Sequence, residues 1–123
     1  MLKLTILLVS ALLLSVMLVS CSKDTWVKEA IIGAWVSVDQ ADTLVFINEE
    51  CFEKNLQPGY MDLYLYSIED DSIKIQYSGI NYICVNPSSH YFQLEDLTLM
   101  IDFSNGCYGF PTKKMEYYSV ELE

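Results

Sequence analysis

The chain has 123 residues and a formal net charge of −10, with 17 acidic residues and only 7 lysines and arginines. This length suits one domain with a modest core. The negative charge excludes nucleic acid and anionic membrane surfaces as natural partners, because both reward basic patches. A cationic partner would be attracted, although a solvated acidic surface is the simpler explanation of the charge.

Residues 1–20 have the features of a secretory signal peptide. Lys3 supplies an early positive charge, and residues 4–19 are almost entirely apolar. A short apolar core behind a basic start, closed by a small residue, is typical of a signal peptide that is removed. A transmembrane helix needs about 20 apolar residues, so an uncleaved anchor helix is the less favoured alternative.

The run that ends this stretch, Leu18-Val19-Ser20-Cys21, resembles the lipobox of bacterial lipoproteins. The resemblance covers the first 21 residues. It implies cleavage before Cys21, a diacylglycerol on its sulfur and a further acyl chain such as palmitate, so that Cys21 attaches the protein to the membrane. More than one acyl chain makes such attachment effectively permanent.

The residues just after Cys21 resemble sorting signals. Ser22 resembles the pattern that sends lipoproteins to the outer membrane, and Lys23-Asp24 looks like a signal for surface display. The predicted location is therefore an outer-membrane lipoprotein, on the periplasmic or the surface-exposed face.

One short helix is predicted at residues 24–32, where apolar residues follow a helical spacing. After Gly33 the apolar residues recur at every second position, which indicates strands. The predicted strands are 35–38, 43–47 with an extension toward Phe52, 60–68, 73–77, 91–94, 97–103 and 115–122. Residues 82–85 would add an eighth strand. The expected fold class is all-β, a small antiparallel up-and-down barrel or sandwich of seven or eight strands, because short turns and no crossover helices connect them.

The alternation is clearest in the strand 60–68. Its two faces consist of Met61, Leu63 and Leu65 on one side and Tyr60, Asp62, Tyr64 and Tyr66 on the other. We expect the aliphatic face to be buried and the tyrosine face to be the polar one. The tyrosines could then form a platform for a sugar or a protein, or simply pack across neighbouring strands.

Gly33-Ala34-Trp35, followed by Asp42-Thr43-Leu44-Val45-Phe46, resembles the start of the barrel in lipocalin-like bacterial lipoproteins. The resemblance spans most of residues 31–122 and implies a lipocalin-like barrel in which Trp35 packs across the closed end. The expected organisation is a signal peptide at 1–20, the acylated cysteine and short helix at 21–32, and a lipocalin-like β domain at 33–123.

Alternate connections of such a meander lie at opposite ends. With seven strands, the acidic turns 39–42, 69–72 and 95–96 share one end. The loops 54–59, 79–90 and 104–112 share the other end with the N-terminal helix. Long loops on a rigid β scaffold usually carry binding surfaces, so we expect the contact surface at that end, facing the membrane. Its predicted residues are Tyr82, His90, Tyr108 and Phe110.

Three cysteines besides Cys21 are expected near the long loops: Cys51, Cys84 and Cys107. Disulfides persist outside the cytoplasm. Cys84–Cys107 is the favoured pair, because this crosslink would join two long loops. Three reduced thiols that pack as small apolar groups are the alternative.

No motif in the sequence points to catalysis, a metal or a cofactor. A nucleophile–base pair of His90 with a free thiol would need basic surroundings, whereas three glutamates lie close to Cys51 in the sequence. We therefore expect a non-enzymatic binding or accessory module of the cell envelope. Its partner would be an envelope protein or a small molecule.

Residues 78–82 carry the pattern S-G-x-x-Y, which is similar to the inhibitory loop of small lipoprotein inhibitors of C-type lysozymes. This resemblance implies an alternative function, the inhibition of a cationic hydrolase. Ser78 and Tyr82 would enter the active site of that enzyme, and the acidic turns would attract it.

Overall fold

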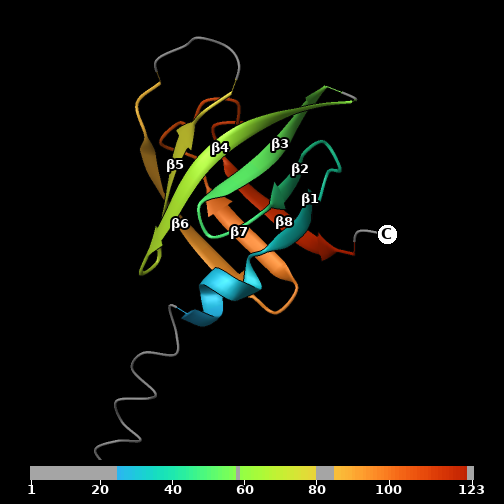
Figure 1. The fold of residues 1–123 in the computed structure, drawn as a ribbon, viewed down its shortest axis with the longest axis vertical. Coiled ribbons are helices and arrows are strands. Elements are labelled where there is room, and N and C mark those ends of the chain that lie inside the picture. Colours follow the sequence, from blue (N-terminus) through green and yellow to red (C-terminus); the bar gives the residue numbers. More distant parts are fainter. Residues whose placement is uncertain (1–24, 58, 80–84, 122–123) are drawn as a thin grey trace, which may run out of the picture.

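A closed barrel of eight antiparallel strands forms the described part of the chain in the computed structural model, which covers residues 25–57, 59–79 and 85–121 (Figure 1). The strands are β1 (Gly33–Ser37), β2 (Thr43–Phe46), β3 (Cys51–Gln57), β4 (Tyr60–Glu69), β5 (Ser72–Tyr77), β6 (Ser88–Glu95), β7 (Thr98–Asp102) and β8 (Lys114–Val120). They follow one another in chain order around the barrel, and β8 pairs with β1 to close it. The predicted all-β antiparallel barrel is confirmed, and the sandwich alternative is wrong. The predicted signal peptide and Cys21 lie outside the described residues.

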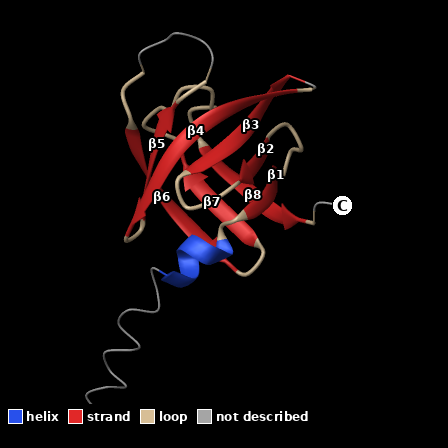
Figure 2. Cartoon of the chain, in the orientation of Figure 1, coloured by secondary structure: helices blue, strands red, loops and turns tan. Residues whose placement is uncertain are grey.

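A short helix at residues 25–30 precedes β1 and covers one end of the barrel (Figure 2). Ile31, which follows it, is fully buried, and Val27 packs against the barrel core. The indole Nε1 of Trp35 donates a hydrogen bond of 2.8 Å to the Ile31 carbonyl. This bond attaches the C-terminal end of the helix to β1. In the part of the chain that the structure describes, no helix is long and apolar enough to span a bilayer.

The buried face of β4 is the opposite of the predicted one. Tyr64 and Tyr66 are 0% and 6% exposed, whereas Met61 and Leu65 are 38% and 42% exposed. The tyrosine rings stack inside the barrel, Tyr64 on Phe52 with ring centres 5.0 Å apart. Tyrosine can face a core when its hydroxyl finds a partner, so the period-two pattern was correct and the assignment of its faces was wrong.

A hairpin within residues 43–57 accounts for the eighth strand. The sequence predicted one strand from Thr43 toward Phe52 and a loop at 54–59, but β2 and β3 form two paired strands. The turn between them is held by Asn48, whose side-chain oxygen accepts hydrogen bonds from the backbone N–H groups of Glu50 and Cys51 at 2.8 and 3.0 Å. Such side-chain-to-backbone bonds stabilise turns. The alternative eighth strand at 82–85 falls largely outside the described residues, and Val85 belongs to no strand.

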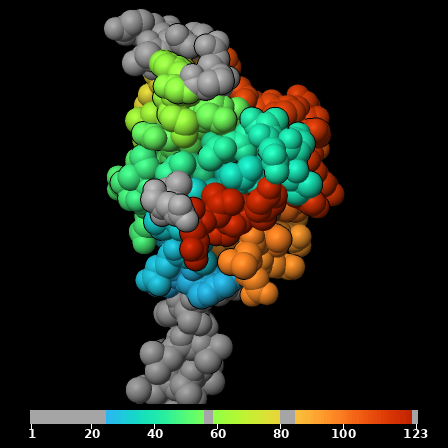
Figure 3. Space-filling model, turned by 90° about the vertical axis from the view of Figure 1, so that its right-hand side faces the viewer, coloured from blue at the N-terminus to red at the C-terminus, as the bar shows by residue number. Residues whose placement is uncertain are grey.

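This hairpin reverses the predicted arrangement of the two ends. The end that carries the helix, called the helix end, also carries the turns 47–50, 70–71 and 96–97. The opposite end, called the long-loop end, carries the connections 38–42 and 103–113, together with the ends of β3 and β5 and the starts of β4 and β6. Figure 1 shows this separation, and Figure 3 shows the helix beside the β6–β7 segment from another side. The prediction that the helix shares an end with the long loops was therefore wrong.

Candidate functional site

The four predicted binding residues do not form one exposed surface. Tyr108 is 39% exposed at the long-loop end, but His90 and Phe110 are buried, at 2% and 9% exposure. Tyr82 lies outside the described residues. His90 and Phe110 are therefore residues of the barrel interior, and of the predicted four only Tyr108 is seen at the surface of the described chain.

His90 is held inside the barrel by two hydrogen bonds. Its Nδ1 lies 2.8 Å from the side-chain oxygen of Asn105, and its Nε2 lies 2.7 Å from the hydroxyl of Ser88. The Asn105 side-chain nitrogen donates to the Ser89 carbonyl, which leaves its oxygen as an acceptor toward the ring. The Asn105 oxygen is thus the acceptor of an Nδ1–H, and the Ser88 hydroxyl satisfies Nε2. The ring also packs edge-on against Phe103, so its contacts explain His90 as a structural residue.

The loop 103–113 folds two aromatic side chains into the long-loop end of the barrel. Phe103 and Phe110 stack with ring centres 4.2 Å apart. Tyr108 packs against Tyr77 at 4.7 Å. The Tyr64 hydroxyl donates a 3.0 Å hydrogen bond to the Tyr108 carbonyl and so fastens the loop to the barrel. Aromatic side chains therefore fill the interior at this end.

Several buried polar groups lie among these rings. The Lys54 ammonium is 3.3 Å from an Asp42 carboxylate oxygen and 5.1 Å from the centre of the Phe110 ring. Asp62 is 1% exposed and accepts a 3.0 Å hydrogen bond from the Tyr77 hydroxyl. Lys54 and Asp62 also face each other across β3 and β4. The single Lys54 ammonium offsets one of the two carboxylates, and one oxygen of each, Asp42 Oδ2 and Asp62 Oδ1, is buried without a hydrogen-bond partner among the described residues. Burial of such groups is costly.

The cysteines do not gather at one end as predicted. Cys51 begins β3 at the helix end, whereas Cys107 lies in the loop 103–113 at the long-loop end. Both are half-buried free thiols. Burial raises the pKa of the Cys107 thiol. Cys84 lies outside the described residues, so the pairing of Cys84 with Cys107 stays a prediction.

The segment that resembles the lysozyme-inhibitor loop is described only at its start. Ser78 is exposed and its backbone N–H donates to the Leu63 carbonyl at 2.9 Å. Tyr82 lies outside the described residues. Among the residues that the structure does describe, no group of three or more His, Cys, Asp or Glu side chains could hold a metal ion.

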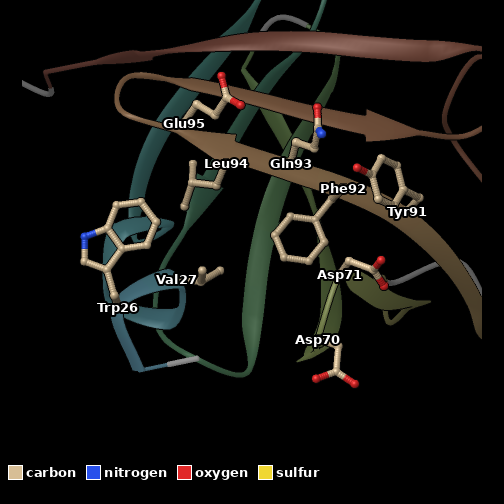
Figure 4. Close-up of a pocket in the computed structure, with 9 residues that line it drawn as sticks. All are labelled: Trp26, Val27, Asp70, Asp71, Tyr91, Phe92, Gln93, Leu94 and Glu95. Carbon is tan, nitrogen blue, oxygen red and sulfur yellow. The ribbon is translucent and has the colours of Figure 1, made fainter. Parts of the chain in front are cut away.

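A groove of about 580 Å³ opens at the helix end, between the helix, the β4–β5 turn and β6 (Figure 4). It is lined by Trp26, Val27, Asp70, Asp71, Tyr91, Phe92, Gln93, Leu94 and Glu95. Figure 4 shows Phe92 and Leu94 pointing toward Val27, with Trp26 and Asp70 at opposite ends of the groove.

Aromatic and acidic side chains give the groove its chemistry. Trp26 and Tyr91 are 51% and 44% exposed, so two aromatic rings are accessible along the groove. Asp70, Asp71 and Glu95 are exposed as well, and none of the described residues that line the groove is basic. The arrangement suits a ligand that is cationic and partly apolar.

Sequence reasoning missed this groove, because it depends on which turns share an end of the barrel. The acidic turns were recognised, but the missed β2–β3 hairpin separated them from the helix in the predicted topology. Asn48-Glu49-Glu50 between two apolar runs was the available signal, because clusters of such polar residues mark turns.

Comparison with known proteins identifies no relative of this chain. No family model, no curated protein and no solved structure matches the chain. The function is therefore inferred from the sequence and the geometry of the site.

Proposed function

We propose that this protein is a lipid-anchored envelope lipoprotein that acts as a non-enzymatic binding module and holds a partner at the membrane surface. The partner binds in the groove between the helix and β6. The observation that carries the proposal is the position of this groove at the end where the chain enters from Cys21.

The length of chain between anchor and barrel supports this placement. Cys21 precedes Thr25 by four residues, and four residues span at most about 14 Å. An acyl chain on Cys21 would therefore hold the helix end close to the bilayer. Trp26 is the second residue of the helix, so the groove would face a partner that is itself at the membrane.

The lining of the groove favours binding over catalysis. Its described residues supply carboxylates, an amide and aromatic rings, and none of them is a histidine, cysteine, serine or lysine. A nucleophile with an adjacent base is the usual requirement for covalent catalysis. Exposed aromatic residues beside charged ones are instead typical of contact surfaces.

Substitution of the anchor tests the first half of the proposal. The Cys21→Ser chain should lose metabolic labelling with palmitate and move from the membrane fraction to the soluble or unprocessed fraction. Wild-type protein should stay with the membrane in high salt, because acyl chains and not charges attach it. Continued labelling of Cys21→Ser would contradict lipidation at this residue.

Photo-crosslinking in intact cells tests the second half. A photoreactive phenylalanine analogue at Tyr91 should capture a specific partner. The matched control is Tyr118, which is 36% exposed on β8, outside the groove. Equal crosslinks from both positions, or none from Tyr91, would overturn the groove as the contact surface.

A further inference from the structure

Among the residues that the structure describes, no strand pairs with the edge of β6 that runs along the groove beyond Tyr91. Pairing between β5 and β6 covers only Ser72–Ile75 against Ser88–Tyr91. Beyond Tyr91, β6 continues to Glu95, and among the described strands this part pairs only with β7, on its other side. In the described chain, the segment 92–95 thus has a partner strand on one edge alone.

The direction of the backbone groups follows from one hydrogen bond. The Phe92 N–H donates to the Asp71 carbonyl at 3.0 Å, on the β5 side of the strand. In an antiparallel ladder the groups of alternate residues point to the same side. The C=O of Phe92 and both the N–H and C=O of Leu94 therefore point toward the groove.

The lining agrees with an open edge. Five consecutive residues of β6, Tyr91 to Glu95, border the groove. Side chains alternate between the two faces of a strand, so a ligand above one face would contact every second residue. A run of five indicates that the groove follows the edge of the strand, where the backbone groups are.

We infer that the groove binds an extended, basic peptide segment of a partner protein, which adds as a strand beside β6. Open sheet edges pair readily with an extended chain. Asp70, Asp71 and Glu95 would attract lysine or arginine side chains, and Trp26 and Tyr91 would pack against apolar ones. Pairing beyond Phe92, along residues 93–95, spans about 10 Å, or three residues of the partner. This inference rests on the proposed function and names the chemistry of the partner.

A synthetic peptide tests the pairing with the full-length chain in a neutral detergent. The probe is an acetylated eight-residue peptide of alternating lysine and valine. Binding should change the emission of Trp26, and the change should be lost in Trp26→Phe, which keeps only the buried Trp35. An analogue methylated on its central amide nitrogens keeps the side chains but cannot pair, so it should bind at least tenfold more weakly.

Charge variants test the selection of basic residues. Asp70→Asn together with Asp71→Asn should weaken binding of the lysine–valine peptide roughly tenfold at low salt, because the double variant removes two exposed ion pairs with the lysines of the peptide. Asp70 has a φ of 55°, and asparagine tolerates this conformation. The control pair Glu49→Gln and Glu50→Gln makes the same charge change at the helix end outside the groove, and it should alter binding less than twofold.

The outcomes separate this inference from the proposed function. Equal binding of the methylated peptide would overturn strand addition while leaving the groove as a binding surface. Absence of peptide binding, together with Tyr91-specific crosslinks in cells, would overturn the basic extended partner and keep the proposed function. Equal losses in the two charge pairs would overturn selection by the groove.

Discussion

Both the ring and the hydroxyl of Tyr64 make contacts that hold this side chain inside the barrel. Its ring stacks on Phe52, and its hydroxyl reaches the Tyr108 carbonyl in the loop 103–113. Burial raises the pKa of the hydroxyl well above its usual value, so it remains a donor throughout the physiological range. One tyrosine thus links the aromatic core to the position of a long loop.

Glycine is needed in that loop at Gly109, where φ is +84° and an added Cβ would collide with the Tyr64 hydroxyl. Gly109→Ala should lower the free energy of unfolding by about 3 kcal/mol, from left-handed strain and the collision together. Gly106, with φ +93° and open space around it, is the matched control, and Gly106→Ala should cost only about 1–2 kcal/mol. Urea denaturation measures both.

The collision itself can be removed to check this account. In a Tyr64→Phe background, Gly109→Ala should cost about as much as Gly106→Ala, because the obstructing oxygen is gone. An unchanged difference between the two glycines would show that Tyr64 is not the cause.

At the scale of single strands, β4 shows what the sequence could and could not predict. The alternation over residues 60–68 identified the strand and its period. The alternation could not show which face is buried. Leucine and methionine are more apolar than tyrosine, so hydrophobicity alone predicts that the leucine and methionine face is buried, whereas the structure buries the tyrosine face. The tyrosine face can be buried because residues of other segments accept hydrogen bonds from the hydroxyls. The Asn48 carbonyl accepts from Tyr66, and the Tyr108 carbonyl accepts from Tyr64.

The strand β3 was missed for a related reason. It carries Glu53 and Lys54 among apolar residues and reads as the start of a polar loop. Lys54 is nevertheless 4% exposed, because the Asp42 carboxylate and the Phe110 ring receive its ammonium group. A buried ion pair depends on a residue of another segment, and one strand's pattern does not reveal it.

That ion pair gives a prediction at the level of the β2–β3 unit. Lys54→Met should lower the free energy of unfolding by about 3 kcal/mol or more, because it leaves the Asp42 carboxylate buried without its cation. The double variant Lys54→Met with Asp42→Asn should cost clearly less than the sum of the two single variants. Additive costs in thermal or urea denaturation would show that the pair is not coupled.

For the whole molecule, one missed hairpin changed the expected orientation on the membrane. The number of strands before a turn decides the end at which it lies, so an additional strand moves every later turn. The barrel, its antiparallel order and the short helix were predictable from local patterns. The groove and its acidic rim were not, because they depend on the strand count as a whole.

The corrected topology places seven carboxylates at the helix end, in the turns that contain Glu49-Glu50, Glu69-Asp70-Asp71 and Glu95-Asp96. If Cys21 is acylated, this acidic end stands nearest the bilayer. Anionic lipids would repel it at low salt, whereas zwitterionic lipids would not. A basic partner segment at the membrane would then neutralise the negative charge of the helix end, which anionic lipids only repel.

The orientation can be measured with the acylated chain in vesicles that contain brominated lipids, which quench nearby tryptophans. Trp26 should be quenched strongly. A tryptophan placed at the long-loop end, in Trp26→Phe with Tyr108→Trp, should be quenched little, because the ten residues of β4 separate the ends by about 25 Å. Trp26→Phe alone gives the contribution of the buried Trp35.

Trp26 quenching should decrease when anionic lipid is added and recover with salt. Stronger quenching at position 108 than at position 26 would reverse the orientation and remove the groove from the membrane surface.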